Sequence, residues 1–121
     1  MTFEKGRVTS AKDLYLRWIE ELWAGHRIAN ELVSEDFVGH WPDHDVHGAD
    51  ELQAMVDTTR ATITDLRFVI EVKPFVEGDM LAVRWIGTGA TPDGPKRFTG
   101  NDMFRVADGR FIEYWTGTSE G

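Results

Sequence analysis

The spacing of hydrophobic residues changes once along this chain, from a helical period to a strand period. Up to about residue 63, apolar side chains recur every three or four positions, as at Leu14, Trp18 and Leu22, which is typical of helices with one buried face. After that point, apolar and polar residues alternate in four long runs, the first of which contains Phe68 and Ile70. Such alternation is typical of half-buried strands. The sequence therefore predicts helices first and an antiparallel meander of strands after them.

Turn and capping residues divide these two halves into elements. Ser10, with Asp13 three residues later, resembles a capping box, and Gly25 is placed to end the helix that follows. We expect helices over 11–24, 27–33 and 49–63, a short strand over 36–41, a loop over 43–48, and long strands over 67–73, 80–89, 96–106 and 110–118. Three N-terminal helices packed on one face of a curved, mostly antiparallel sheet would make an α+β roll with room for a cavity. Because no repeat or interior linker is present, we expect a single domain over residues 1–121.

Composition and charge narrow the classes of partner. The chain has 121 residues, 41% of them hydrophobic, and contains no cysteine, so disulfides and thiolate chemistry are excluded. Its net charge of -8 repels nucleic-acid phosphates and anionic lipids, and we expect neither nucleic acid nor a membrane as partner. No apolar run is long enough to span a bilayer, and the start, MTFEKGRVTS, lacks the apolar core of a signal peptide. The cytoplasm is therefore the expected location.

Asp102 is the first candidate for chemistry. Alternation along its strand places Asp102 on the same side as Phe98, Gly100 and Phe104, which is the apolar, inward side. A carboxylate among apolar groups must be paired, hydrogen-bonded or protonated, because its burial is costly. Asp102 could therefore be a neutral acid that donates a hydrogen bond to a developing oxyanion. The other interpretation is a structural carboxylate that accepts bonds from NH groups, indoles or His40.

A second cluster contains His40, His44 and His47, with Asp43 and Asp45 between them. Imidazole and carboxylate ligands suit zinc or iron, so a metal site is one interpretation, and a polar loop at the mouth of a pocket is the other. The second interpretation is preferred, and we expect no metal. His40 shares the parity of the apolar residue two positions before it, so we expect its side chain to point inward. There it could serve as a base or proton shuttle, or be a hydrogen-bonded core histidine.

Aromatic side chains are numerous enough to line a pocket as well as fill a core. The chain has five Trp, seven Phe and two Tyr, and such side chains suit flat apolar ligands. Trp18 and Trp85 lie on apolar stripes typical of the core, whereas Trp41, which precedes a proline, is expected at the rim. The candidate substrate-binding residues are Tyr15, Trp18, Trp41, Trp85, Phe104, Tyr114 and Thr116.

Neither face of the last predicted strand is clearly polar. Ile112 and Tyr114 share one face, while Phe111 and Trp115 share the other. Burial of both faces would be explained if a second copy of the chain covered the outer one, so we expect a homodimer.

Several motifs that would bind a cofactor or activate a nucleophile are missing. The sequence has no phosphate-binding glycine loop, no dinucleotide fingerprint and no nucleophile elbow. We therefore expect no cofactor, and either acid–base chemistry on a small hydrophobic molecule or plain binding of one.

A series of short segments together resembles a known family. The segments are WAGH at 23–26, DFVGH at 36–40, GADEL at 48–52, DLRF at 65–68, GDMLAVRW at 78–85, GTG at 87–89, FRV at 104–106 and DGRFIEYW at 108–115. Their order and spacing resemble the SnoaL-like polyketide and ester cyclases of the nuclear transport factor 2-like superfamily, to which ketosteroid isomerase also belongs. The resemblance covers about Asp13 to Trp115. It implies a cone-shaped α+β barrel, often dimeric, with a pocket under the helices.

The resemblance also implies a type of chemistry. The cyclases close a ring by an intramolecular aldol step without a cofactor, using an acid–base aspartate at the position of Thr116 here. Asp102 matches a histidine of the cyclases and the oxyanion-stabilising aspartate of ketosteroid isomerase, whose tyrosine and base aspartate fall near Trp18 and His40.

We therefore expect an enzyme for aldol-type cyclisation, isomerisation or dehydration of a hydrophobic carbonyl compound. Asp102 would stabilise or protonate the oxyanion, and His40 would move the proton. The alternative is a non-catalytic small-molecule-binding protein of the same fold. A threonine at position 116 favours this alternative, because it cannot replace a carboxylate as an acid–base group.

Overall fold

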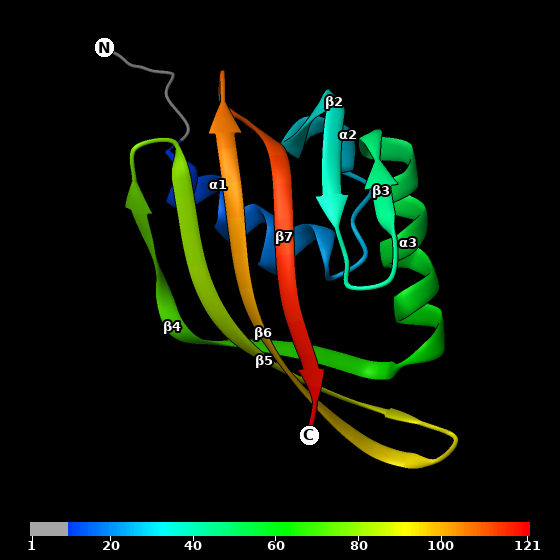
Figure 1. Ribbon diagram of the computed structural model, residues 1–121. Helices are drawn as coiled ribbons and strands as arrows, with labels where there is room; N and C mark the ends of the chain where they lie inside the picture. Colours follow the sequence, from blue (N-terminus) through cyan, green and yellow to red (C-terminus); the bar gives the residue numbers. More distant parts are fainter. Residues whose placement is uncertain (1–9) are drawn as a thin grey trace.

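A computed structural model of the chain describes residues 10–121 (Figure 1). Its helical elements are α1 (Ala11–Arg17), the π-helical turn η1 (Trp18–Leu22), α2 (Ala29–Leu32) and α3 (Gly48–Thr62). Its strands are β2 (Val33–His40), β3 (Asp45–His47), β4 (Thr64–Glu77), β5 (Met80–Thr91), β6 (Gly94–Ala107) and β7 (Arg110–Glu120). The long strands bend around the helices, so the molecule is an α+β fold with a curved sheet.

The first helix changes its winding where its side chains enter the core. Ser10 caps α1, because its hydroxyl accepts a hydrogen bond from the amide of Asp13 at 3.1 Å. The chain continues directly into η1, and the wider π turn leaves both Trp18 and Leu22 buried. Gly25 follows with a φ of 106°, a left-handed conformation that favours glycine and ends the helical segment.

Within residues 10–121, the strands form one sheet of six strands in the order β3-β2-β7-β6-β5-β4. Strands β4 to β7 form an antiparallel meander. β2 lies parallel to β7, and β3 pairs with β2 at the sheet edge. This order places β5, β6 and β7 in the middle of the sheet, where their inward side chains face the helices.

A β-bulge in β7 changes which of its residues face inward. Val106 pairs with Phe111, but the preceding residue, Arg105, pairs with Glu113, so β7 contains one extra residue at this point. As a result, Phe111 and Tyr114 are both buried, with exposed fractions of 0% and 3%. Strict alternation puts these two residues on opposite faces, and for that reason it leaves the inward face of this strand undecided.

The α+β class and the curved, mostly antiparallel sheet predicted from the periodicity are confirmed. The more detailed prediction of three N-terminal helices is not confirmed, and the structure supports only a few helices packed on the sheet. α2 has four residues rather than the seven expected over 27–33, and α3 follows β2 and β3. No helix in the described part of the chain is long and apolar enough to cross a membrane.

The expectation of a loop over 43–48 is wrong, because residues 45–47 form β3. The amide of Trp41 donates to the carbonyl of His44 at 2.9 Å, which closes a tight turn. The chain then runs back along β2, and Val46 becomes buried with an exposed fraction of 3%. A single apolar residue among histidines and aspartates gives too little alternation to reveal a strand of this length.

Candidate functional site

A cavity of about 170 Å³ lies between the concave face of the sheet and the helices. Its walls are mostly aromatic and aliphatic, with Asp102 as the single carboxylate. The lining residues are Trp18, Ile19, Trp23, Trp41, Met55, Thr59, Ile63, Leu66, Phe68, Trp85, Phe98, Asp102, Tyr114 and Thr118. An apolar cavity with few polar groups is typical of a small-molecule site.

Asp102 is held in the cavity wall by donors from the two neighbouring strands. Its Oδ2 accepts hydrogen bonds from the Trp85 indole N–H at 2.8 Å and from the Tyr114 hydroxyl at 2.9 Å. Its Oδ1 accepts a bond from the Thr116 hydroxyl at 2.8 Å. The carboxylate is 2% exposed, so the prediction that Asp102 faces inward is confirmed. The bond from the indole agrees with the interpretation of Asp102 as a structural carboxylate. Its place in the cavity wall agrees with the interpretation of Asp102 as a functional one.

Burial and hydrogen bonding act on Asp102 in opposite directions. Loss of hydration raises the pKa of its carboxyl from 3.8 to about 6, while the bonds from Thr116, Trp85 and Tyr114 oppose the rise. An indole N–H can only donate, so the bond from Trp85 favours the ionised carboxylate. A carboxyl group with this pKa is mostly ionised near pH 7, yet it is a stronger base than an ordinary aspartate. A carboxyl group with a raised pKa in the wall of a cavity is a candidate for a general base.

Two tyrosine hydroxyls are buried near this carboxylate, and they differ in their bonding. Burial raises the pKa of Tyr114, and the charge of Asp102 raises it further, so Tyr114 stays neutral and donates its hydrogen. Burial, followed by the charge of Asp102, also raises the pKa of Tyr15. The Tyr15 hydroxyl, however, has no hydrogen-bond partner among the described residues. Tyr114 is therefore the tyrosine that acts on Asp102 directly.

Gly100 makes room for the indole that binds Asp102. Trp85 and Gly100 are paired across β5 and β6, and a Cβ atom at position 100 would overlap the Trp85 ring. On another side, Phe68 meets the same ring edge to face, with 5.1 Å between ring centroids. The missing side chain thus allows the indole N–H to reach the carboxylate.

The aromatic candidates divide between the cavity and the core behind it. Tyr15 and Phe104 are fully buried and pack together with 5.6 Å between ring centroids. Thr116 is hydrogen-bonded to Asp102 rather than part of the apolar wall. The candidates that line the cavity are Trp18, Trp41, Trp85 and Tyr114.

The expectation that His40 points inward is wrong. In β2 the buried residues Phe37 and Gly39 face the core, so alternation directs His40 to the outer face of the sheet. There its Nδ1 lies 3.0 Å from Oδ1 of Asp45, and its Nε2 lies 2.7 Å from Oε2 of Glu113. The hydrogen bond to Glu113 is the main cause that raises the pKa of His40, with partial opposition from burial and further support from Asp45. The structure therefore does not bring His40 and Asp102 to one ligand atom.

His40, His44 and His47 contact different partners. His44 stacks on Trp41 with 6.2 Å between ring centroids and pairs with Asp43 at 2.7 Å. The backbone amide of His47 donates to Glu51 at 2.8 Å. Across residues 10–121, no three His, Asp or Glu side chains are grouped so that they could hold a metal ion. The geometry gives the metal interpretation of this cluster no support.

Part of the lining was not predicted from the sequence. Met55 and Thr59 of α3 line the cavity together with Ile63, the residue that caps the C-terminus of this helix, whereas the helical period predicted all three as packed core. A threonine on an otherwise apolar stripe was the available signal. Phe98 lies near the start of β6 and Thr118 near the end of β7, both far from the turn that joins the two strands. The bend of the sheet brings these ends to the cavity.

Comparison with known proteins identifies the family. The sequence matches the model described as the SnoaL-like domain over residues 15–114. The chain belongs to the SnoaL-like family. The resemblance found in its short segments is therefore confirmed. No curated protein matches this SnoaL-like chain.

Solved structures share the SnoaL-like fold. A SnoaL-like polyketide cyclase from Agrobacterium tumefaciens superposes with a TM-score of 0.79 at 16% identity, covering 93% of this chain and 93% of that one. IdmH from Streptomyces antibioticus gives a TM-score of 0.76 at 23% identity, covering 91% and 93%. An NTF2-like protein from Exiguobacterium gives 0.73 at 21% identity, covering 88% and 98%. At these identities the likeness establishes the fold alone.

Proposed function

We propose that this SnoaL-like chain is an enzyme that performs cofactor-free acid–base chemistry on a small hydrophobic carbonyl compound. The observation that carries the proposal is Asp102, a hydrogen-bonded carboxylate in the wall of an apolar cavity, with its pKa raised to about 6. The family and its cyclase members support the same type of reaction. Buried carboxylates of this kind are typical of proton-transfer sites.

The lining restricts the class of substrate. Among the lining residues, Asp102 is the only charged side chain, and no lysine or arginine is present. A substrate with a carboxylate or phosphate in the cavity would be repelled by Asp102 and would find no cation to pair with. The indole rings of Trp18, Trp41 and Trp85 instead suit a flat, uncharged ring system. The proposed substrate is therefore a neutral cyclic or aromatic ketone.

In the proposed reaction, Asp102 acts as the general base, in place of the oxyanion-stabilising role expected from the sequence, because a carboxyl group with a pKa of about 6 is mostly ionised near pH 7. Its Oδ1 accepts one bond from Thr116, whereas Oδ2 accepts two, so Oδ1 keeps a lone pair for a substrate proton. The C–H bond next to the carbonyl breaks, its proton forms an O–H bond with Asp102, and the electron pair moves onto the carbonyl oxygen. Return of the proton to another carbon completes an isomerisation, and attack of the enolate on a second carbonyl forms the C–C bond of an aldol cyclisation. His40 takes no part, because it lies on the outer face.

The test measures proton abstraction directly and does not require the natural substrate. Neutral aryl ketones and cyclic enones are incubated with the protein in deuterated water, and deuterium incorporation next to the carbonyl is followed by NMR. We expect exchange that depends on the wild-type protein and is absent in Asp102→Asn. Binding of these ketones without any exchange would instead support the alternative of a non-catalytic binding protein.

Tyr114→Phe is expected to raise the pH midpoint of Asp102 by about 1 pH unit, because one bond to the carboxylate is lost. The acid limb of the pH–rate profile should move by the same amount. Tyr15→Phe is the matched control, since it removes a buried hydroxyl that has no partner among the described residues. A carbon-detected NMR titration of Asp102 gives both midpoints. Equal midpoints in the two variants would show that the Tyr114 bond does not tune the carboxylate.

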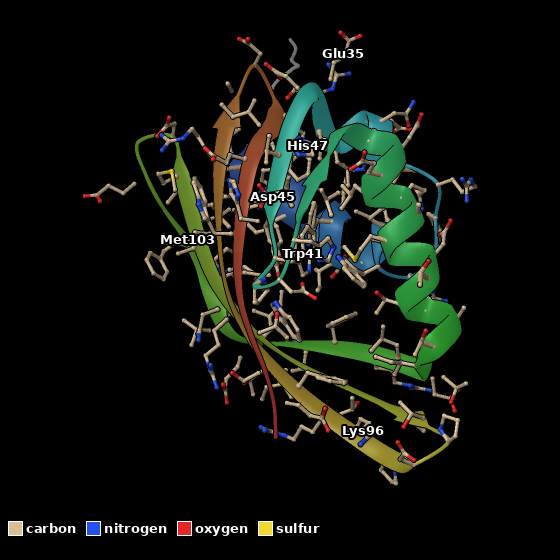
Figure 2. The ribbon with its side chains drawn as sticks, turned by 45° about the vertical axis from the view of Figure 1, so that its right-hand side comes forward. Glu35, Trp41, Asp45, His47, Lys96 and Met103 are labelled. Carbon is tan, nitrogen blue, oxygen red and sulfur yellow. The ribbon has the colours of Figure 1, made fainter. Side chains whose placement is uncertain are left out.

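We also propose that two copies of the chain pair through the outer face of the sheet. Val69, Phe75 and Met103 are exposed by 64%, 60% and 49%. Met103 alternates with the buried Asp102, and Figure 2 shows it on the side of the sheet away from the helices. Phe75 and Met103 both lie opposite Ala82 of β5 and so share this face. Exposed apolar side chains of this size support an interaction surface.

Phe75→Glu is expected to convert this dimer into a monomer, because it places a charge in the apolar patch. Light scattering coupled to gel filtration measures the mass of both proteins, and circular dichroism checks that the variant is folded. A wild-type mass of one chain at micromolar concentration would contradict the proposal.

A further inference from the structure

A buried base needs a route by which its proton reaches solvent. Asp102 is 2% exposed, and its three hydrogen-bond donors differ in whether they can pass a proton on. The Trp85 indole cannot, because its N–H is a donor only. The Tyr114 hydroxyl is itself buried, with an exposed fraction of 3%. The Thr116 hydroxyl can both donate and accept, so it can take up one proton while it passes another on.

Thr116 is the inner member of a pair of hydroxyls that ends at the surface. Its Oγ1 lies 2.8 Å from Oδ1 of Asp102 and 2.6 Å from Oγ1 of Thr118, and both are good hydrogen-bond distances. Thr118 is exposed, and it also lines the cavity. The two threonines alternate along the inward side of β7, so the strand itself sets their spacing. A continuous line of hydrogen bonds thus joins the buried carboxylate to solvent.

We infer that Thr116 and Thr118 form a proton relay between Asp102 and the solvent at the mouth of the cavity. The inference rests on the proposed function only in taking Asp102 as the group that exchanges a proton. During uptake, water gives a proton to Oγ1 of Thr118, Thr118 gives its own to Oγ1 of Thr116, and Thr116 gives its own to Oδ1 of Asp102. Each hydroxyl breaks one O–H bond and forms another, so neither threonine holds a charge. Release follows the same steps in reverse.

The relay differs from a path through the cavity itself. The other walls of the cavity are mostly apolar, and a bound substrate would occupy its interior. The threonine hydroxyls instead lie along β7 at the wall, and their hydrogen bonds do not depend on water inside the cavity. The position that the family resemblance assigns to an aspartate thus holds a residue that can pass a proton to Asp102 without being a base.

The relay is tested by the rate of proton exchange at Asp102 in the protein without substrate. Line shapes of the isotope-labelled carboxyl carbon across a pH titration give both this rate and the midpoint. Thr118→Val keeps the shape of the residue and all three bonds to Asp102. We expect exchange to slow by about tenfold or more with the midpoint unchanged. Thr118→Ser should restore the rate, and Thr99→Val, the same change on the outer face of β6, should leave it unaltered.

Two results would overturn the relay. One is an exchange rate in Thr118→Val equal to that of the wild type. The other is a shifted midpoint in Thr118→Val that Thr118→Ser does not restore, because that would show a structural effect on Asp102. Either result leaves the proposed function standing, because that proposal is tested separately, by deuterium exchange into a ketone with the wild-type protein and by its loss in Asp102→Asn.

Discussion

Asp102→Asn is expected to stabilise the protein at neutral pH while it removes the proposed activity. A buried carboxylate whose pKa is raised from 3.8 to about 6 is held in the folded state at a cost of about 3 kcal/mol once it is ionised. An asparagine carries no charge, so this cost disappears. Its carbonyl oxygen can still accept from Trp85 and Tyr114, and its amide can donate to the Thr116 oxygen. We expect a net gain of about 1–3 kcal/mol near pH 7.

The pH dependence of this gain has a definite sign. Between the unfolded pKa of 3.8 and the folded pKa of about 6, the folded protein binds more protons at Asp102 than the unfolded chain does. The contribution of Asp102 to stability therefore falls as pH rises through this window, which is opposite to the behaviour of a salt-bridged aspartate. Below the window the wild type and Asp102→Asn should differ least, and above it the difference should be constant.

Urea unfolding at a series of pH values measures this difference, and the deuterium-exchange assay measures the activity of the same samples. Asp108→Asn is a matched control, because it makes the same change at an exposed turn residue with a φ of 52°, a conformation that asparagine also adopts. A variant that is less stable than the wild type at pH 8 would show that the hydrogen bonds outweigh the burial cost. Retained exchange activity would remove Asp102 from the proposed mechanism.

The direction of Asp102 could be predicted from the sequence because β6 alternates regularly around it. The same reasoning failed for His40. Two neighbouring apolar residues of β2, Phe37 and Val38, point to opposite faces, and it is Phe37, the larger one, that is buried. In β7 the bulge brings Phe111 and Tyr114 to the same side. A bulge of this kind cannot be recognised from the spacing of apolar residues in the sequence. Alternation along a strand therefore predicts the direction of a side chain well only where the strand pairing stays in register.

The partners of Asp102 were harder to predict than Asp102 itself. Trp85, Tyr114 and Thr116 come from two other strands, and their approach depends on the pairing of β5, β6 and β7. Sequence reasoning included all three as substrate-binding candidates, but the contacts place them first as donors to the carboxylate. Thr118 gave no signal, because an exposed threonine near the end of a strand is common, and only its distance to Thr116 gives it a role.

Gly100→Ala is expected to destabilise the protein by about 2–3 kcal/mol and to raise the midpoint of Asp102. The added methyl group would overlap the rigid Trp85 ring, which Phe68 confines on another side. The indole would have to shift, and its bond to Asp102, which lowers the pKa of the carboxyl, would be lost or lengthened.

The matched control is Gly117→Ala, on the adjacent strand. A Cβ atom there meets Asn101 at 3.4 Å, an ordinary contact distance, so we expect a change of less than about 0.5 kcal/mol. Chemical denaturation and the carboxyl titration are measured on both variants. Destabilisation of Gly100→Ala without a shift in the Asp102 midpoint would mean that the sheet, rather than the indole, yields to the methyl group. If Gly100→Ala lowers the stability and also raises the Asp102 midpoint, the lack of a side chain at Gly100 sets the basicity of the carboxylate two residues away.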